Sequence, residues 1–331
     1  MGCKIKAIEF VFPEQIYSNE DINREHPHYD IDKFQNKVGI SKRYRTREDE
    51  TGLDLAVKAC NLILNKYSDL EVDYILYCTQ SPDYIIPTTA CILQDKLNLS
   101  KNVGALDFNL GCSGYVYGLQ LARGLILSGE CKNILLVTAE TYTKFIHEKD
   151  VVNKAIFGDA ASASLICEHE DDGVLKAVTK TDGSGFDKLI IKNGGSRFKY
   201  NKESALKSYG NNFYTDNKLY MNGPDIFNFT IENIPNLYFE ILEINNLKSE
   251  NIDYVIFHQA NKFMLNFLRK KLKFPKDKFY IDIDDGGNTV SSTIPIAIKR
   301  ALNSGDIKSG DKLLLVGFGV GLSYAGTIVE L

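Results

Sequence analysis

The stretch NLGCSGYVYG, residues 109–118, places Cys112 between two glycines where secondary structure is expected to change. An apolar strand pattern over 103–110 ends there, and an apolar helix pattern over 114–129 follows at once. Unpaired N–H groups and the positive end of a helix dipole stabilise a thiolate. The pattern therefore predicts a nucleophilic Cys112 with a lowered pKa. A buried structural thiol is the alternative, because free cysteine often packs as a small apolar side chain.

Two polar residues in the second half occupy comparable positions. His258 ends the apolar strand pattern of VIFHQAN, and Asn288 follows a Gly-rich turn in DDGGNTVSST. The other four histidines lie in polar or charged segments. We expect Cys112, His258 and Asn288 to converge if the two halves pack face to face. Such a set suits nucleophilic catalysis at an acyl group.

Short apolar runs alternate with amphipathic helical patterns along the chain, which predicts an α/β fold. Strands are expected at 4–12, 72–80, 103–110, 133–140, 161–168, 174–183, 254–261, 279–283, 312–319 and 323–331. Helices are expected at 52–66, 88–98, 114–129, 225–245, 262–273 and 291–304. The order is similar in two halves, 1–170 and 171–331, divided at EHEDDG. The irregular segment 184–222 is interpreted as a functional loop or a solvated insertion.

The composition excludes several classes of protein. The 331 residues are 44% hydrophobic and carry a net charge of −4, so nothing indicates a nucleic-acid partner. Apolar runs are too short for a membrane span, and the N-terminus does not resemble a signal peptide. Seven cysteines without a CxxC pair or a Cys/His cluster indicate a reduced, cytoplasmic protein with no metal. Four of them lie in apolar patterns and are expected to pack as small hydrophobes: Cys60, Cys78, Cys91 and Cys167.

Several motifs in order give the chain a family resemblance. They are FPEQIYSNEDI, VGISKRYR, SPDYIIPTTACILQ, GCSG, FGDAASASLI, HQAN, GGNT and GFGVGLSYAG. Together they resemble the β-ketoacyl-acyl carrier protein synthase III family, decarboxylating condensing enzymes of the thiolase superfamily. The resemblance implies a thiolase-like fold of duplicated βαβαβαββ halves in an α-β-α-β-α layered sandwich, assembled as a homodimer.

The resemblance also implies a mechanism without metal or other cofactor. Cys112 would take the acyl group from an acyl-CoA or acyl-carrier protein, and malonyl-carrier protein would then lose CO₂. His258, through Nε2–H, and the Asn288 amide would stabilise the enolate. The turn Phe318-Gly319-Val320, with the Cys112 N–H, would form the oxyanion hole. A strand is expected after this Gly-rich turn, which excludes a dinucleotide-binding loop.

Departures from the family pattern concern the substrate. Lys33 stands where many members carry the tryptophan that stacks on the adenine of coenzyme A, and Lys37 replaces an arginine. Carrier-protein delivery of the primer becomes more plausible. Ile86 matches a position, often Phe, that reaches the partner's acyl pocket, and a smaller group there would admit a longer or branched primer. Ala260 and Asn261 match pocket residues, and Lys33 and Lys37 are candidate contacts for CoA or its pantetheine arm.

The helix segment FLRKKLK, 267–273, concentrates Arg269, Lys270 and Lys271 next to HQAN. An acidic acyl carrier protein would dock there, or the segment is a solvated helix face. Two other functions remain open. An acyltransferase of the same fold would pass the Cys112-bound acyl group to an oxygen or nitrogen nucleophile, and such members tend to lose the asparagine. A non-catalytic carrier-binding subunit would need none of the three polar residues.

Overall fold

The computed structural model describes residues 1–210 and 212–331. The strands are β1 Gly2–Val11, β2 Gln15–Ser18, β3 Lys42–Arg45, β4 Tyr74–Cys78, β5 Gly104–Phe108, β6 Asn133–Glu140, β7 Ala160–His169, β8 Val178–Thr181, β9 Leu189–Ile190, β10 Lys207–Tyr209, β11 Asn212–Tyr214, β12 Tyr220–Met221, β13 Tyr254–Phe257, β14 Lys312–Gly319 and β15 Ser323–Glu330. The α-helices are α1 Asn19–Glu25, α2 Ile31–Val38, α3 Gly52–Lys66, α4 Thr89–Lys96, α5 Gly114–Leu127, α6 Val151–Ile156, α7 Gly223–Ile244, α8 Lys262–Lys271 and α9 Thr293–Ser304. Short 3₁₀ turns include η5, Val290–Ser292.

Two mixed sheets form the frame of the molecule. The first has the order β1-β7-β6-β4-β5 and uses only residues before 170. The second has the order β13-β14-β15-β8 and uses only residues after 177. Each sheet contains parallel pairs, β4 with β5 and β6 in the first and β13 with β14 in the second. The last strand of each half pairs antiparallel to its neighbour, as in β6–β7 and β14–β15.

The strand expected at 279–283 is absent from the second sheet, and that part of the prediction is wrong. A single bridge joins Phe279 to Val255, the Tyr280 N–H donates to the Val255 carbonyl, and the Asp282 N–H donates to the side chain of Gln259. Because the side-chain oxygen replaces the next strand carbonyl, the ladder stops. The second half therefore repeats the βαβαβαββ order of the first half with one strand missing.

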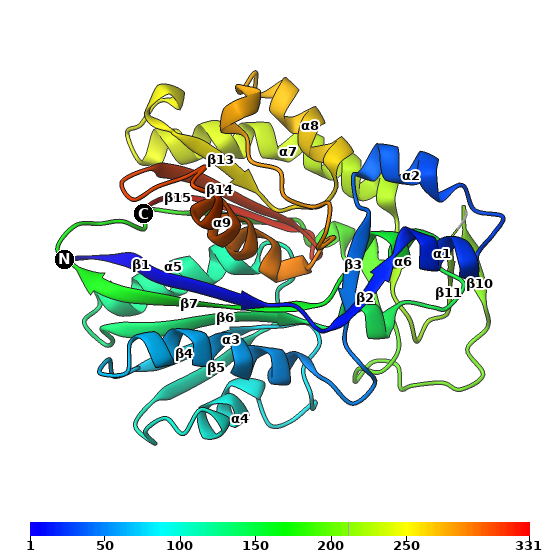
Figure 1. The fold of residues 1–331 in the computed structure, drawn as a ribbon, viewed down its shortest axis with the longest axis horizontal. Coiled ribbons are helices and arrows are strands. Elements are labelled where there is room, and N and C mark those ends of the chain that lie inside the picture. The colour runs from blue at the N-terminus through cyan, green and yellow to red at the C-terminus, as the bar shows by residue number, and fades with distance from the viewer. Residues whose placement is uncertain (211) are drawn as a thin grey trace.

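Helices fill three layers around the two sheets (Figure 1). Helices α5 and α9 lie between the sheets, where α5 contacts β4 and β6 on one side and β14 and β15 on the other. Helices α3 and α4 cover the outer face of the first sheet, and α7 covers that of the second with α8 packed beside it. The largest core cluster joins residues of both sheets to this middle layer. The result is the expected α-β-α-β-α sandwich.

Several short elements gather at one end of the sandwich. Strands β2 and β3, helices α1, α2 and α6, and the small strands of 184–222 all lie on the right of Figure 1. The sequence patterns did not predict these elements, because they are too short for a clear period. The turns after β5 and β13 open toward them. Within residues 1–210 and 212–331, no helix is long and apolar enough to cross a membrane.

Candidate active site

Cys112 lies in the tight turn that joins β5 to α5. Helix α5 begins at Gly114 with Ser113 as its N-cap, so the sulfur precedes the helix by two residues instead of lying in its first turn. A Cβ at Gly114 would lie 2.2 Å from the sulfur of Cys78, which explains why a glycine starts the helix. A Cβ at Gly319 on β14 would lie 3.0 Å from the Cys112 sulfur. The second sheet thus fits closely against the cysteine turn of the first half.

His258 follows β13 directly and is 2% exposed. Its backbone N–H donates to the Val316 carbonyl at 2.8 Å, which continues the pairing of β13 with β14 by one residue. The ring Nδ1 lies 2.7 Å from Oγ1 of Thr293, at the start of α9. The ring also packs edge-on against Phe318, with centroids 5.6 Å apart. Strand end, helix start and aromatic ring together fix the imidazole.

Asn288 is held in place by the first half of the chain. Its N–H donates to the Ile156 carbonyl at 2.8 Å, and its carbonyl accepts from Gly158 at 3.1 Å. The preceding Gly287 has φ +67, and a Cβ there would lie 2.8 Å from the Ile156 carbonyl oxygen. Only glycine meets both conditions without strain. The GGN motif is therefore the joint at which the second half docks against the end of α6.

One cavity of about 520 Å³ brings the three buried side chains together. Asn288 Nδ2 lies 3.4 Å from His258 Nε2. Cys112 lines the same space, as do Phe318 and Gly319. The remaining wall is mainly apolar and comes from several elements: Val152, Ile156, Phe157, Leu189, Met221, Pro224, Ile226, Ala260 and Met264. A cavity of this size with few polar groups suits an acyl chain and the thioester that carries it.

The electrostatics of Cys112 differ from the prediction. Burial raises the pKa of the thiol to about 12, and the charge of nearby Glu140 adds to this rise. The backbone N–H groups of Cys112 and Val320 point at the sulfur and lower its pKa only in part. Burial in the opposite sense lowers the pKa of His258 to about 3. The resting pair is therefore a neutral thiol and a neutral imidazole, and a lowered thiol pKa was wrong.

Glu140, at the end of β6, is a buried carboxyl group that the sequence patterns did not single out. It accepts from the Gln80 N–H and from the hydroxyls of Ser81 and Ser291, and it is 0% exposed. Burial raises its pKa to about 8. Ser291 belongs to the second half, so this group ties the two halves together beneath Cys112. The sequence offers one signal for it, because Glu140 is an acidic residue at the end of an apolar strand pattern.

The turn after β14 approaches Cys112 closely. Val320 presents its N–H toward the Cys112 sulfur, and its side chain packs where a Cβ at Gly111 would lie. Strand β15 begins at Ser323, so no helix follows the turn and a dinucleotide-binding loop is excluded, as predicted.

The substrate residues separate into two groups. Lys37 on α2 lies at the cavity, with Nζ 5.1 Å from the ring centroid of Phe263, and Ala260 and Asn261 line the cavity. Lys33 is exposed on the same helix and does not line it. Ile86 is 83% exposed and does not line the cavity of its own chain.

The three basic side chains of α8 differ in whether they form hydrogen bonds to other parts of the chain. Arg269 donates to the carbonyl of Phe274, in the segment that follows the helix, at 3.1 Å. Lys271 donates to the Ile231 carbonyl of α7 at 2.6 Å. Lys270 is exposed, and its side chain makes no hydrogen bond or ion pair with the described residues.

All seven cysteines are free thiols. Cys60 and Cys78 are buried as expected, and Cys167 is partly buried. Cys91 on α4 is exposed, so its expected packing as a core residue is wrong. It occupies the solvent face of an eight-residue helix whose buried side is made by Ala90 and Leu93.

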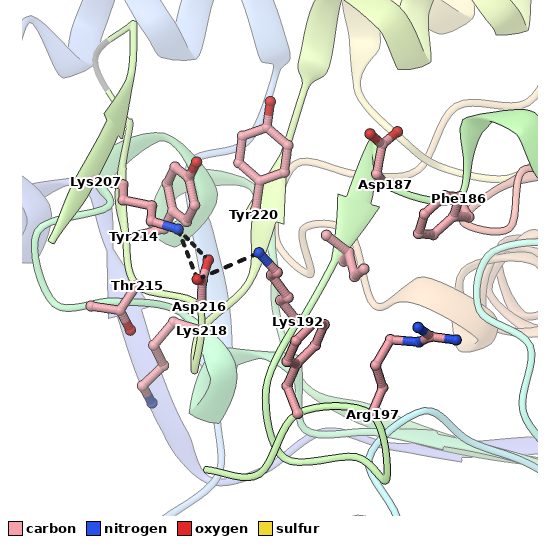
Figure 2. Close-up of a pocket in the computed structure, with 12 residues that line it drawn as sticks. Phe186, Asp187, Lys192, Arg197, Lys207, Tyr214, Thr215, Asp216, Lys218 and Tyr220 are labelled. Atoms are coloured by element: carbon pink, nitrogen blue, oxygen red, sulfur yellow. Dashed lines mark hydrogen bonds and ion pairs between the residues drawn. The ribbon is translucent and has the colours of Figure 1, made fainter. Parts of the chain in front are cut away.

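The segment 184–222 forms a wall between two cavities. Strands β9 and β12 pair with Leu189 opposite Met221 and Ile190 opposite Tyr220. The first pair lines the cavity of Cys112. The second pair lines another cavity of about 760 Å³, where Lys207 and Lys192 pair with Asp216 (Figure 2). Among residues 1–210 and 212–331, no cysteine or histidine lines that second space.

The fold and the buried Cys-His-Asn cavity define a condensing enzyme of the thiolase fold. Comparison with known proteins agrees. A family model described as 3-oxoacyl-[acyl-carrier-protein] synthase III matches residues 106–183. A second model, for the C-terminal part of the same family, matches residues 242–331. A β-ketoacyl-[acyl-carrier-protein] synthase III of Clostridium perfringens is 37% identical, covering 100% of this chain and 99% of the relative.

Solved structures give the same result. A crystal structure of a 3-oxoacyl-(acyl-carrier-protein) synthase III is 40% identical, with a TM-score of 0.97 and full coverage of both chains. A 3-oxoacyl-(acyl-carrier protein) synthase from Burkholderia xenovorans is 29% identical, with a TM-score of 0.92, covering 100% of this chain and 94% of the other. The chain belongs to the 3-oxoacyl-[acyl-carrier-protein] synthase III family, a family of acyltransferases.

Proposed function

We propose that this chain condenses an acyl thioester primer with malonyl-acyl carrier protein, using Cys112, His258 and Asn288. The observation that carries the proposal is their meeting in one apolar cavity, with the amide of Asn288 facing the ring of His258. An amide donates a hydrogen bond without competing for a proton. It therefore suits stabilisation of an enolate formed by loss of CO₂ better than removal of a proton from carbon.

In the first step the Cys112 thiol attacks the carbonyl carbon of the primer thioester. The thiol pKa is high, so its proton passes to His258 Nε2 as the new C–S bond forms. The N–H groups of Cys112 and Val320 donate hydrogen bonds to the carbonyl oxygen and stabilise the negative charge that develops on it. The tetrahedral intermediate collapses, the bond to the carrier sulfur breaks, and His258 returns the proton to the departing thiolate. Cys112 is left acylated.

In the second step malonyl-carrier protein enters and loses CO₂. The electron pair of the broken C–C bond forms an enolate whose oxygen accepts a hydrogen bond from Asn288 Nδ2. The enolate carbon attacks the acyl carbon, and the bond to the Cys112 sulfur breaks. The product is a 3-oxoacyl thioester, and the Cys112 thiolate takes up one proton. This reaction starts fatty-acid synthesis or a related specialised pathway.

Purified protein tests this proposal with malonyl-carrier protein and a set of acyl thioesters. We expect a mass increase on the peptide that holds Cys112, together with CO₂ release. Cys112→Ser should remove the adduct, whereas Cys91→Ser, which removes the exposed thiol, should keep it. Adduct without CO₂ release would indicate transfer to an oxygen or nitrogen nucleophile. If neither the adduct nor CO₂ release is observed, the chain is a carrier-binding subunit without catalytic activity.

Delivery of the primer by a carrier protein fits the cavity mouth better than delivery by coenzyme A. Lys37 covers the ring of Phe263, and Lys33 offers no aromatic surface for an adenine. A basic group beside exposed aromatic rings suits an acidic carrier with an apolar contact. Comparing acyl-CoA with acyl-carrier protein of the same chain length tests this, and equal kcat/KM values would contradict it.

A homodimer agrees with the exposed edge of the first sheet. Strand β5 lies at that edge, and its Leu106 is 44% exposed. Ile85 and Ile86, in the loop after β4, are 90% and 83% exposed. An unpaired edge with apolar side chains is a site for pairing with a second copy. Sedimentation of the wild type and of Leu106→Glu tests the assignment, since only the wild type should sediment as a dimer.

The place of Ile86 on this face supports its role in the acyl pocket of a partner subunit. A primer of medium or branched length should compete better than acetyl, and acetyl as the best primer would refute this. The seven free thiols agree with a reducing cytoplasm. The proposed chemistry uses thiol, imidazole, amide and backbone N–H groups of this chain, without a cofactor.

A further inference from the structure

Thr293 contacts the imidazole of His258 at Nδ1, and the mechanism above does not use this contact. It is the first residue of α9, is 3% exposed, and does not line the cavity of Cys112. Its Oγ1 lies 2.7 Å from His258 Nδ1 and 3.1 Å from the carbonyl oxygen of Val290. A carbonyl oxygen only accepts hydrogen bonds, so the Thr293 hydroxyl donates its proton to Val290. Its lone pairs are then left to accept from Nδ1–H.

The other nitrogen of the ring faces a donor. The Val290 N–H donates to Asn288 Oδ1 at 2.9 Å, which fixes the side-chain amide with its NH₂ group toward the ring. Asn288 Nδ2 then lies 3.4 Å from His258 Nε2. An NH₂ group needs an acceptor, and an unprotonated Nε2 supplies one. Both contacts of the ring agree on one neutral form, with the proton on Nδ1.

This arrangement reverses the tautomer that the sequence resemblance implied. An imidazole with Nε2–H from the start would donate to the enolate but accept nothing from the Cys112 thiol. In the first step the lone pair of Nε2 must accept the Cys112 proton, whereas in the second step an N–H at Nε2 would stabilise the enolate oxygen. A ring that keeps its proton on Nδ1 meets both needs if Nε2 gains a second proton between the steps.

We infer that Thr293 is a positioning residue that keeps a proton on His258 Nδ1 through the whole cycle, so that only Nε2 exchanges protons with Cys112 and the substrate. The inference deepens the proposed function and rests on it. Condensation consumes one proton in total, because a malonyl carboxylate becomes CO₂ and the Cys112 thiolate becomes a thiol. We assign that proton, taken from water, to Nε2.

The charge of the substrate makes this second protonation favourable. Burial lowers the pKa of His258 to about 3 when the cavity is empty. A malonyl carboxylate in the same cavity favours the charged ring and raises that pKa. The charged ring donates through Nε2 to the enolate oxygen and then passes the proton to the Cys112 sulfur when the C–S bond breaks. Thr293 and the Val290 carbonyl stabilise the charged form from the other side.

Nitrogen NMR of the whole protein with ¹⁵N-labelled histidine tests the tautomer directly. We expect the His258 proton on Nδ1 in the wild type and in Thr293→Ser, which keeps the hydroxyl. Thr293→Val removes the hydroxyl at nearly constant volume, and a population with Nε2–H should grow. His258→Gln identifies the resonance. A wild-type ring protonated on Nε2 would overturn the inference.

Kinetics give a second readout that a structural role would not move. In Thr293→Val the kcat of condensation should fall about 10- to 100-fold, since a hydrogen bond to a charged group is lost. The KM for malonyl-carrier protein should stay unchanged, because Thr293 does not line the cavity. Thr293→Ser should restore most of the rate. Equal rates in Thr293→Val and wild type would refute the role.

A matched control separates these effects from lost stability. Thr230 on α7 is 0% exposed, and its hydroxyl donates to the Ile226 carbonyl at 2.7 Å. Thr230→Val therefore removes a buried hydroxyl away from the ring and should keep both kcat and the tautomer. The NMR result does not depend on turnover. Failure of the proposed function, with no adduct and no CO₂ in the wild type, is thus distinguishable from a wrong tautomer.

Discussion

Replacing Gly319 by alanine tests how closely the second sheet fits the nucleophile. The new Cβ would lie 2.9 Å from the Cys112 Cβ and 3.0 Å from its sulfur. Carbon atoms in ordinary contact are about 3.5–4.0 Å apart, so the two side chains must separate by roughly 0.5–1 Å. The pairing of β14 with β13 ends at Val316, but its pairing with β15 continues through Gly319, opposite Ser323, and restrains the backbone there. We therefore expect the Cys112 side chain to be the group that moves.

The expected loss of rate follows from that displacement. A misplacement of about 1 Å costs roughly 100-fold in a positioned reaction, so Gly319→Ala should acylate Cys112 about 10- to 100-fold more slowly. The free energy of unfolding should fall by about 1–3 kcal/mol, as for other overpacked cores. Mass spectrometry of Cys112 at timed intervals gives the rate, and urea unfolding gives the stability.

Gly124 supplies the control, because it lies on α5, the helix that follows Cys112, and a Cβ there would meet nothing within 4 Å. Gly124→Ala should leave acylation unchanged and raise stability by about 1 kcal/mol through helix propensity. If Gly319→Ala acylates Cys112 at the rate of the wild type, the close fit does not position the sulfur and the reasoning fails.

Two further predictions concern charge. Burial raises the pKa of Glu140 from 4.5 to about 8, so between these values the folded chain holds one proton more than the unfolded chain, and stability should fall as pH rises through this window. Glu140→Gln mimics the protonated form, and urea unfolding at pH 6 and 9 should show a weaker loss than in the wild type; equal losses would contradict the prediction. Lys270→Glu should raise the KM for malonyl-carrier protein about 3- to 10-fold with kcat unchanged, in line with the weak energies of exposed charge pairs. The exposed Lys101, in the turn after α4, is the control, and an equal effect of Lys101→Glu would return α8 to an ordinary solvated face.

The local patterns of the sequence determined the frame of this protein well. The two sheets and the six predicted helices follow from apolar periodicity, glycines mark the turn that carries Cys112, and a change from apolar to polar residues marks the turn at His258. Such patterns are short-range, because side-chain burial on one strand or helix repeats every two or 3.6 residues. The strand expected at 279–283 failed because a side chain of Gln259, distant in sequence, took the N–H that a ladder would use.

The properties of the site were decided only by tertiary structure. From its own neighbourhood Cys112 was expected to be acidic, yet burial by both halves raises the pKa of its thiol. Thr293 gained its place from a contact with His258, 35 residues away in the same half, and Glu140 from a contact with Ser291 in the other half; no local period records either contact. Burial and hydrogen bonding depend on every group that surrounds an atom in space. The sequence could therefore single out Cys112, His258 and Asn288 as candidates, whereas only the packed fold decided which groups surround them and how the pKa values of the thiol and the imidazole shift.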